Sequence, residues 1–154
     1  MFSHVMSGGQ TGVDRAALDV ALAAGIPCSG WCPQGRKAED GPIPERYPLQ
    51  ETPSDDYEQR TEWNVRDADG TLIVTRGSPV GGTALTIEFA RELGKPCLVL
   101  DLDDRPAATV VRVWALENKV RVLNVAGPRE SRNPGIYTAS AAFFHHVFSA
   151  DARR

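Results

Sequence analysis

A cluster of glycines stands near the start of the chain, in the stretch SGGQTGVDRA. Gly8, Gly9 and Gly12 follow a short apolar run and precede a strongly helical segment. A glycine-rich turn at the start of a helix lets a ligand approach unpaired backbone N–H groups, and the helix dipole adds partial positive charge there. The chemistry that this arrangement favours is the binding of an anion such as a phosphate group.

The stretch differs from two well-known nucleotide-binding loops. It is not G-x-G-x-x-G and it lacks the Gly-Lys-Ser/Thr of a P-loop, and no acidic residue ends the second expected strand to bind a ribose hydroxyl. These differences argue against a standard NAD or ATP site. The alternative interpretation is that the glycines only make a tight turn between a strand and a helix.

Two later loops have related features. In RGSPVGGTALTIEFA, Gly81 and Gly82 precede Thr83, a residue type that caps helices well. In AGPRES, Arg129 is either an anion clamp or a solvated surface residue. If the strand order is 2-1-3-4-5, the first and third strands are neighbours, and both glycine loops face one crevice at the carboxyl edge of the sheet. The predicted ligand-binding residues are Ser7, Gly8, Gly9, Gln10, Thr11, Gly12, Asp14, Arg15, Arg36, Gly81, Gly82, Thr83 and Arg129.

Catalytic side chains are harder to find. Asp14 lies in the first turn of a helix, where a carboxylate stabilises the N-terminus without any catalytic role, or alternatively meets a ligand hydroxyl. Glu39 and Asp40 lie with Arg36 on a proline-rich segment that can deliver a base or a cation if it closes over a ligand. No Ser-His-Asp or Cys-His set is visible, which argues against acyl transfer. The residues therefore favour a binding protein, and catalysis stays open.

The segments that must position these residues alternate between short β-rich runs and helical stretches. Strands are expected at 3–6, 28–32, 71–75, 97–102 and 120–125, and helices at 13–24, 56–68, 83–93, 107–117 and 137–148. The alternation predicts an α/β fold, namely a Rossmann-like three-layer α/β/α sandwich with a mainly parallel sheet of five or more strands. The runs TLIVT and PCLVLDL are continuously apolar, as expected for strands covered on both faces.

The periodicity is lost between about residues 33 and 55, where five prolines occur. A connection of this length without secondary structure is usually either functional or disordered, and the prolines favour a stiff, ordered flap. With 154 residues, of which 42% are hydrophobic and 24% are charged, we expect a single domain over residues 1–154 that includes this flap.

Charge and cysteine content narrow the possible functions. The net charge of −3 gives no overall positive field for nucleic acid or an anionic membrane. No apolar run reaches the length of about 18 residues that a membrane span needs.

The few cysteines and the absence of a signal-peptide pattern predict a cytoplasmic protein. Cys28 and Cys32 are expected in one strand, about 13 Å apart and beyond disulfide reach. Together with the scattered histidines, this predicts no directly bound metal.

Four stretches together resemble the molybdenum carrier family: SGGQTGVDRAALDVA, GWCPQGRKAEDGPIPERYPLQ, GGTALTIEFARELGKPC and LNVAGPRES. This family is a branch of the Rossmann-like group that contains the lysine decarboxylase-like phosphoribohydrolases and DNA-processing protein A. The resemblance covers most of the chain. It implies a phosphate-bearing or nucleotide-type ligand at the glycine loops, with molybdenum cofactor (molybdopterin, a pterin with a phosphate tail) as the cargo. It also implies a homodimer or a higher homo-oligomer.

The enzymes of that group carry a Pro-Gly-Gly-x-Gly-Thr-x-x-Glu loop whose glutamate serves N-glycosidic cleavage. In this chain Thr86 stands at the glutamate position, and the nearest acid is Glu88. Two positions turn a helix by about 200°, so Glu88 is expected to face away from the site, on the solvated surface. The resemblance thus implies a binding protein for a phosphate-bearing small molecule, and a nucleoside monophosphate N-glycosidase stays as the alternative.

Overall fold

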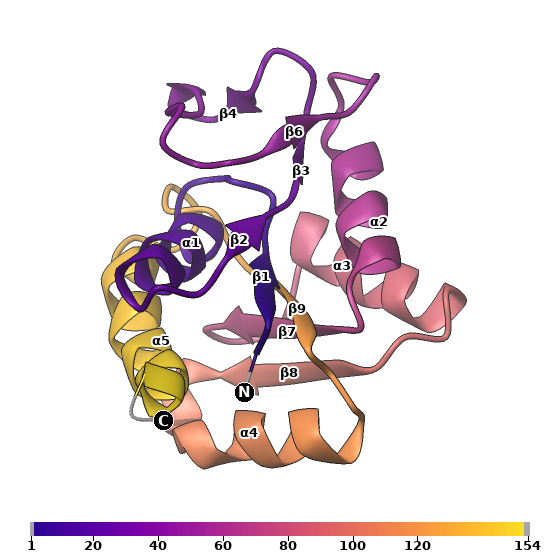
Figure 1. Cartoon of the computed structure of the whole chain (residues 1–154). Coiled ribbons are helices and arrows are strands. Elements are labelled where there is room, and N and C mark those ends of the chain that lie inside the picture. The colour runs from indigo at the N-terminus through magenta and orange to yellow at the C-terminus, as the bar shows by residue number, and fades with distance from the viewer. Residues whose placement is uncertain (1, 153–154) are drawn as a thin grey trace.

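The computed structural model describes residues 2–152 and contains a parallel five-stranded sheet between helices. The strands of this sheet are β1 (His4–Met6), β2 (Cys28–Ser29), β7 (Gly70–Thr75), β8 (Cys97–Asp101) and β9 (Val122–Ala126). The helices are α1 (Val13–Ala23), α2 (Tyr57–Asp67), α3 (Gly81–Glu92), η1 (Leu102–Asp104), α4 (Ala108–Glu117) and α5 (Ile136–Ala152). Helix α5 packs against α1 and α4, while α2 packs against α3 on the other side of the sheet (Figure 1). The α/β class and the Rossmann-like layers agree with the sequence prediction.

The strand order is β2-β1-β9-β7-β8, and every pairing is parallel. The predicted order 2-1-3-4-5 is therefore wrong in chain order, because the last strand, β9, lies between β1 and β7. If the strands are numbered from β7 instead, the same sheet reads 2-1-3-4-5, so the expected topology is present in circularly permuted form. The chain leaves the carboxyl ends of β7 and β9 in opposite directions, toward α3 and α5. The switch point of the sheet therefore lies between β7 and β9, and not between β1 and β7.

Burial differs between two strands that the sequence treats alike. All six residues of β7 are buried, as expected for a strand covered on both faces. No residue of β8 is fully buried, and Val99 is 40% exposed, because β8 forms an edge of the sheet. The prediction that both runs are fully covered holds for β7 only, since an apolar run does not reveal whether its strand has one neighbour or two.

The strand expected at 28–32 is divided at Gly30. Strand β2 pairs with β1, whereas β3 (Trp31–Cys32) pairs with β6 (Gln50–Glu51) outside the main sheet. Gly30 has φ of 147°, and a Cβ atom there would lie 2.0 Å from the carbonyl oxygen of Ser7. Only glycine fits this close approach, so the chain leaves the sheet here and enters the proline-rich segment.

The proline-rich segment, residues 33–55, is ordered and is called the flap below. It contains β4 (Lys37–Ala38), which pairs antiparallel with β5 (Gly41–Pro42). The Arg36 guanidinium donates at 2.8 to 3.2 Å to four backbone oxygens, those of Ile43, Pro44, Tyr47 and Leu49. The Tyr47 hydroxyl donates to Asp19 of α1 at 2.7 Å, which fastens the flap to the body of the protein. Figure 1 shows the flap at the top of the view, above α1 and β1.

The contact between β7, β9 and α1 at Gly127 gives a first prediction. A Cβ atom at Gly127 would lie 2.3 Å from the Val74 carbonyl oxygen and 2.6 Å from Cγ2 of Val13. Gly127→Ala should therefore lower the free energy of unfolding by about 1 to 3 kcal/mol in urea denaturation. Gly82→Ala is the matched control, because its Cβ would meet no atom within 4 Å and should change stability by less than about 1 kcal/mol. Equal stability of the two variants would contradict this packing.

Candidate functional site

A cavity of about 640 Å³ lies at the carboxyl edge of the sheet. Residues that follow β1, β7 and β9 line it, and α2 forms a further wall. Its size falls within the range of about 300 to 1,000 Å³ that is usual for small-molecule sites. Of the predicted site residues, the cavity lining includes Gly8, Gln10, Asp14, Gly81, Gly82, Thr83 and Arg129. The first and second glycine loops therefore reach the same cavity, although their strands are not neighbours.

Four arginines line this cavity, namely Arg60, Arg76, Arg129 and Arg132. Three of them have a carboxylate oxygen at 3.8 to 4.0 Å, which is beyond hydrogen-bond distance. The fourth, Arg132, has no ion pair with the side chains of residues 2–149. The cavity wall thus carries cationic charge whose hydrogen-bond donors are not taken up by carboxylates.

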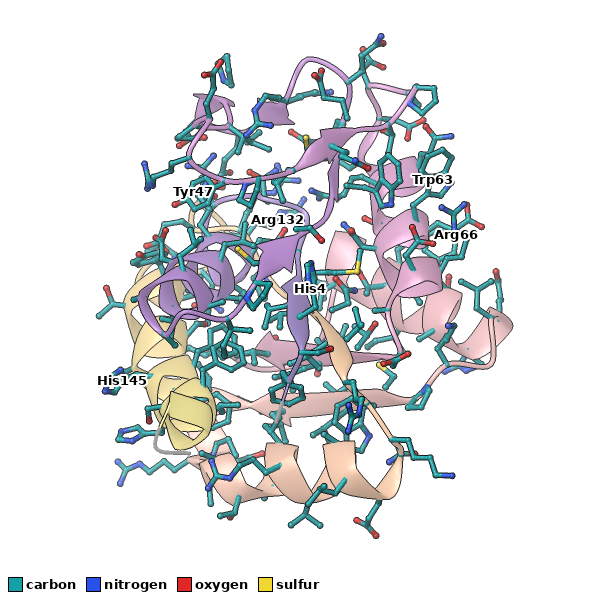
Figure 2. The ribbon with its side chains drawn as sticks, viewed as in Figure 1. His4, Tyr47, Trp63, Arg66, Arg132 and His145 are labelled. Carbon is teal, nitrogen blue, oxygen red and sulfur yellow. The ribbon has the colours of Figure 1, made fainter. Side chains whose placement is uncertain are left out.

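Two arginines outside the cavity lining are paired more closely. Arg15 donates to both carboxylate oxygens of Asp40, at 2.5 and 2.7 Å. Arg66 donates to Asp67 at 2.7 Å and lies over the Trp63 ring, 4.6 Å from its centroid. Figure 2 shows Trp63 and Arg66 next to each other on α2. The cavity arginines lack such close carboxylate partners, although Arg60 donates to the Thr61 hydroxyl at 3.1 Å and to the Gly8 carbonyl oxygen at 3.2 Å. Guanidinium groups with unused donors can bind an anion with two parallel hydrogen bonds.

Arg60 and Arg129 meet at the ring of Tyr57. Their guanidinium carbons lie 5.0 and 5.3 Å from the ring centroid, and Nζ of Lys37 lies 4.9 Å from it. Burial lowers the pKa of Arg60, and the like charge of Arg129 lowers it further against the attraction of Asp14. An anion placed between Arg60 and Arg129 would relieve this repulsion.

The start of α3 has free backbone donors. The N–H groups of Gly81 and Gly82 make no hydrogen bond within the described part of the chain, and the first turn of α3 contains no acidic residue. The N–H of Thr83 donates to the Val80 carbonyl oxygen at 3.2 Å. An Arg132 guanidinium nitrogen lies 3.5 Å from the position that a Cβ of Gly81 would take. Backbone amides and a guanidinium therefore face the same end of the cavity.

The start of α1 is different, because the chain itself occupies several of its donors. Oδ2 of Asp14 accepts from the Gln10 N–H at 3.2 Å, and Oε1 of Gln10 accepts from the Thr11 N–H at 3.1 Å. The Val13 N–H donates to the Pro128 carbonyl oxygen at 3.3 Å. The Asp14 carboxylate thus stands where an external anion was expected. The geometry supports an anion-binding role for the second glycine loop more than for the first.

The other predicted residues, Ser7, Gly9, Thr11, Gly12, Arg15 and Arg36, are not part of the cavity lining. Several of them hold its walls together. The Ser7 hydroxyl donates to the Val125 carbonyl oxygen at 2.8 Å, so it ties β1 to β9. A Cβ at Gly9 would lie 2.5 Å from Cδ1 of Leu49, so Gly9 faces the flap and not the cavity. A Cβ at Gly12 would lie 2.4 Å from the Pro128 carbonyl oxygen, so Gly12 packs against the loop after β9.

Glu39 joins the flap to two of the loops. Its carboxylate accepts hydrogen bonds from the hydroxyl groups of Thr11 and Ser131, and Arg129 lies 4.0 Å away. Although partial burial opposes the change, the hydrogen bonds from Ser131 and Thr11 lower the pKa of Glu39 below its usual value. Neither Glu39 nor Arg36 lines the cavity, so the flap supplies no base or cation there in this structure. The stretch GRKAEDG serves to fasten the flap.

Helix α2 provides a wall of the cavity that the predicted site residues do not include, although the sequence marks Asn64 as a plausible candidate without a place. Tyr57, Arg60 and Asn64 all line the cavity, and their spacing of three and four residues places them on one helical face. The spacing alone indicates that these three side chains share one face of the helix. Because the helix is polar on all sides, the sequence does not show which of its faces packs against the rest of the protein. Arg76 and Arg132 were also missed, because in the sequence a loop arginine that lines a cavity looks like an ordinary surface residue.

Metal-binding chemistry finds little support in the described residues. Figure 2 shows His4 on β1 and His145 on α5, well separated in the fold. Nε2 of His4 lies 2.6 Å from the Ser29 hydroxyl. Among the side chains of residues 2–149, no group of three or more His, Cys, Asp or Glu is arranged to hold a metal ion. In the same range, every helix is too short or too polar to cross a bilayer.

Fold and cavity define a Rossmann-like α/β protein with a cavity at the carboxyl edge of its parallel sheet. The circularly permutated YpsA SLOG family matches residues 5–148, and the chain belongs to this family. The permutation in the family's description agrees with the observed strand order. A comparison with curated protein sequences gives no significant match.

A solved structure is also similar over nearly the whole chain. It is that of a "putative molybdenum carrier protein" from Syntrophus aciditrophicus SB, with 50% sequence identity and a TM-score of 0.91. The match covers 96% of this chain and 94% of that one. The resemblance to the molybdenum carrier family that the sequence indicated is thereby confirmed.

The buried Asp14 gives a prediction about pH. Burial raises its pKa to about 6, although Arg60 and the Gln10 N–H oppose the shift. Because the folded-state pKa lies above that of the unfolded chain, this group favours folding most below about pH 4, and the contribution is lost as pH rises through 6. We expect the stability of the wild type relative to Asp14→Asn to fall by about 2 kcal/mol between pH 4 and pH 7. Urea denaturation measures this difference, and a difference that is constant with pH would refute the assignment.

Proposed function

We propose that the protein binds a phosphate-bearing small molecule in the cavity at the carboxyl edge of its sheet and acts as a carrier for it. One observation supports this most strongly: four cavity arginines have no carboxylate of the described side chains within hydrogen-bond distance. The free N–H groups of Gly81 and Gly82 lie at the same cavity. Both kinds of donor match the oxygens of a phosphate group.

Molybdenum cofactor is the cargo that we propose. The similar protein from Syntrophus aciditrophicus SB carries a molybdenum carrier name, and the cofactor is a pterin with a phosphate tail. Arg132 and the start of α3 are suited to hold that tail, with Arg60 and Arg129 as further cations. Guanidinium and amide donors suit phosphate and oxyanion groups better than a bare metal cation, so the metal would enter as part of the cofactor.

We further propose that residues 1–154 form a single domain and that the protein is a cytoplasmic homo-oligomer. Helix α4 supports the oligomer, because it presents an exposed apolar stripe. Val110, Val113 and Leu116 recur every three residues on this helix and are 42%, 53% and 71% exposed. Larger apolar surfaces on a soluble protein often mark an interface with another chain.

Ligand binding can be tested with adenosine monophosphate as a phosphate-bearing probe. We expect the probe to raise the melting temperature in a concentration-dependent way, because a ligand that binds only the folded state stabilises it. Arg132→Ala should weaken binding about tenfold or more in calorimetric titration, since it removes a charge-assisted contact. Arg66→Ala, on α2 but outside the cavity lining, is the control and should bind as the wild type does.

The same titrations with inorganic phosphate and with molybdopterin separate a general anion site from a cargo site. Mass spectrometry of the protein as purified gives an independent reading of any bound molecule. The proposal is wrong if none of the three probes changes the melting temperature and no small molecule is found. It is also wrong if Arg132→Ala and Arg66→Ala bind equally well.

A nucleoside monophosphate N-glycosidase is the second candidate, and Asp14 is the observation that favours it. A buried carboxyl group with a pKa of about 6 in a cavity wall is suited to proton transfer near neutral pH. Glu88, in contrast, is exposed on α3, as the sequence predicted, and Thr86 lines the cavity in its place. Release of free base from nucleoside monophosphates, abolished in Asp14→Asn, would establish this activity, and its absence in folded protein would exclude it for these substrates.

A further inference from the structure

The side-chain amide of Gln10 has different surroundings at its two ends. Gln10 lines the cavity and is 4% exposed. Its Oε1 accepts from the N–H of Thr11 at 3.1 Å and from the N–H of Glu39, in the flap, at 2.9 Å. Its Nε2 is buried and has no hydrogen-bond partner among the described residues. One amide group therefore holds the flap with its oxygen and keeps unused donors on its nitrogen.

The contacts of Gln10 fix which end of the amide is the oxygen. If the nitrogen took the place of Oε1, its protons would meet the N–H donors of Thr11 and Glu39, which is unfavourable. The backbone of Gln10 is held as well. Its N–H donates to Oδ2 of Asp14 at 3.2 Å, and its carbonyl oxygen accepts from the Arg15 N–H at 3.2 Å. Nε2 is therefore held in place as a donor without a partner.

A buried donor without a partner is unfavourable, and in a cavity wall it points to an acceptor that a ligand supplies. The other donors of the wall are the cavity arginines and the free N–H groups of Gly81 and Gly82. These donors favour an occupant rich in acceptor oxygens. Such an occupant carries the kind of group that Nε2 of Gln10 lacks.

Three residues of the loop after β1 tie that loop to the hairpin of β4 and β5. Gln10 accepts from the Glu39 N–H, and the Thr11 hydroxyl donates to the Glu39 carboxylate. Arg15 donates to Asp40 at 2.5 and 2.7 Å. Of these three loop residues, Gln10 alone belongs to the cavity lining. An occupant of the cavity can therefore act on the hairpin through the Gln10 amide.

We propose that Gln10 couples the occupant of the cavity to the flap: Nε2 donates to an oxygen of the occupant, and Oε1 then binds the Glu39 N–H more strongly. A hydrogen bond donated by an amide polarises it and makes its oxygen a better acceptor. The inference rests on the proposed function, because it needs an occupant with acceptor oxygens. The coupling is reciprocal, so the bond from Gln10 to the flap also strengthens binding of the occupant.

The Glu39 N–H is a direct probe of this coupling. Hydrogen exchange of single amides in the wild type is measured by NMR with and without adenosine monophosphate. We expect the ligand to slow exchange at Glu39 about fivefold or more, because its hydrogen bond to Gln10 becomes stronger. The Ile43 N–H donates to the Arg36 carbonyl oxygen at 2.7 Å, inside the flap. It is the internal reference and should exchange at the same rate in both states.

Two variants of Gln10 separate the two ends of its amide. Gln10→Glu keeps an acceptor for the Glu39 N–H and lacks the nitrogen. We expect its exchange at Glu39 to match the free wild type and not to respond to adenosine monophosphate, which should bind about fivefold or more weakly. Gln10→Met removes both ends without adding charge. Exchange at Glu39 should then be faster with and without the ligand, and binding should also be weaker.

Gln50→Glu is the matched control. Gln50 is exposed on β6 and is not part of the cavity lining, so the same chemical change there should leave both binding and exchange at Glu39 as in the wild type. An equal loss of binding in Gln50→Glu and Gln10→Glu would show a general effect of charge and would overturn the role of Gln10.

The outcomes separate the two proposals. If adenosine monophosphate raises the melting temperature of the wild type but leaves exchange at Glu39 unchanged, the coupling is overturned while the proposed function stands. Equal slowing in Gln10→Glu and the wild type also overturns it. If neither adenosine monophosphate nor inorganic phosphate raises the melting temperature, the inference fails together with the proposed function. Circular dichroism establishes that the variants fold. If the Gln10 variants do not, exchange at Glu39 against Ile43 in the wild type decides the result.

Discussion

The position of β9 between β1 and β7 determines the rest of the molecule's architecture. In parallel sheets, the carboxyl ends of neighbouring strands share one edge, so the loops after β1, β9 and β7 come together there. β9 supplies Leu123 and Val125 to the core, and the loop after it supplies Arg129 and Arg132 to the cavity. The same strand therefore completes the hydrophobic core and brings cations to the site.

The two helices that begin at glycine loops use their N-termini in different ways. Helix α1 receives a carboxylate from its own first turn, Asp14, which bonds the loop and stays partly unpaired in the cavity wall. Helix α3 has no acid in its first turn and leaves the N–H groups of Gly81 and Gly82 free. The same glycine-rich pattern thus precedes two different helix starts. Backbone N–H groups before α1 are hydrogen-bonded within the protein, whereas those of Gly81 and Gly82 in α3 have no partner among the described residues. The acid at position 14 makes the difference.

The sequence predicted the main helices and strands well because the alternation of apolar β-rich runs and helical stretches is a local signal. It could not predict the strand order, since the apolar runs of β7, β8 and β9 look alike and the place of β9 depends on how α4 returns to the sheet. Half of the predicted site residues reach the cavity. Arg36 does not, because four carbonyl oxygens of the flap take its donors, and no local pattern distinguishes such an arginine from one that binds a ligand.

The contacts of Glu39 connect two loops that border the cavity, although Glu39 itself does not line it. Thr11 and Ser131 belong to the loops after β1 and β9, and Glu39 holds them together from the flap. For a ligand that enters the cavity by parting these loops, as under the proposed function, those bonds would have to break first. The bonds of the Glu39 carboxylate would then act on the residence time of such a ligand rather than on its affinity.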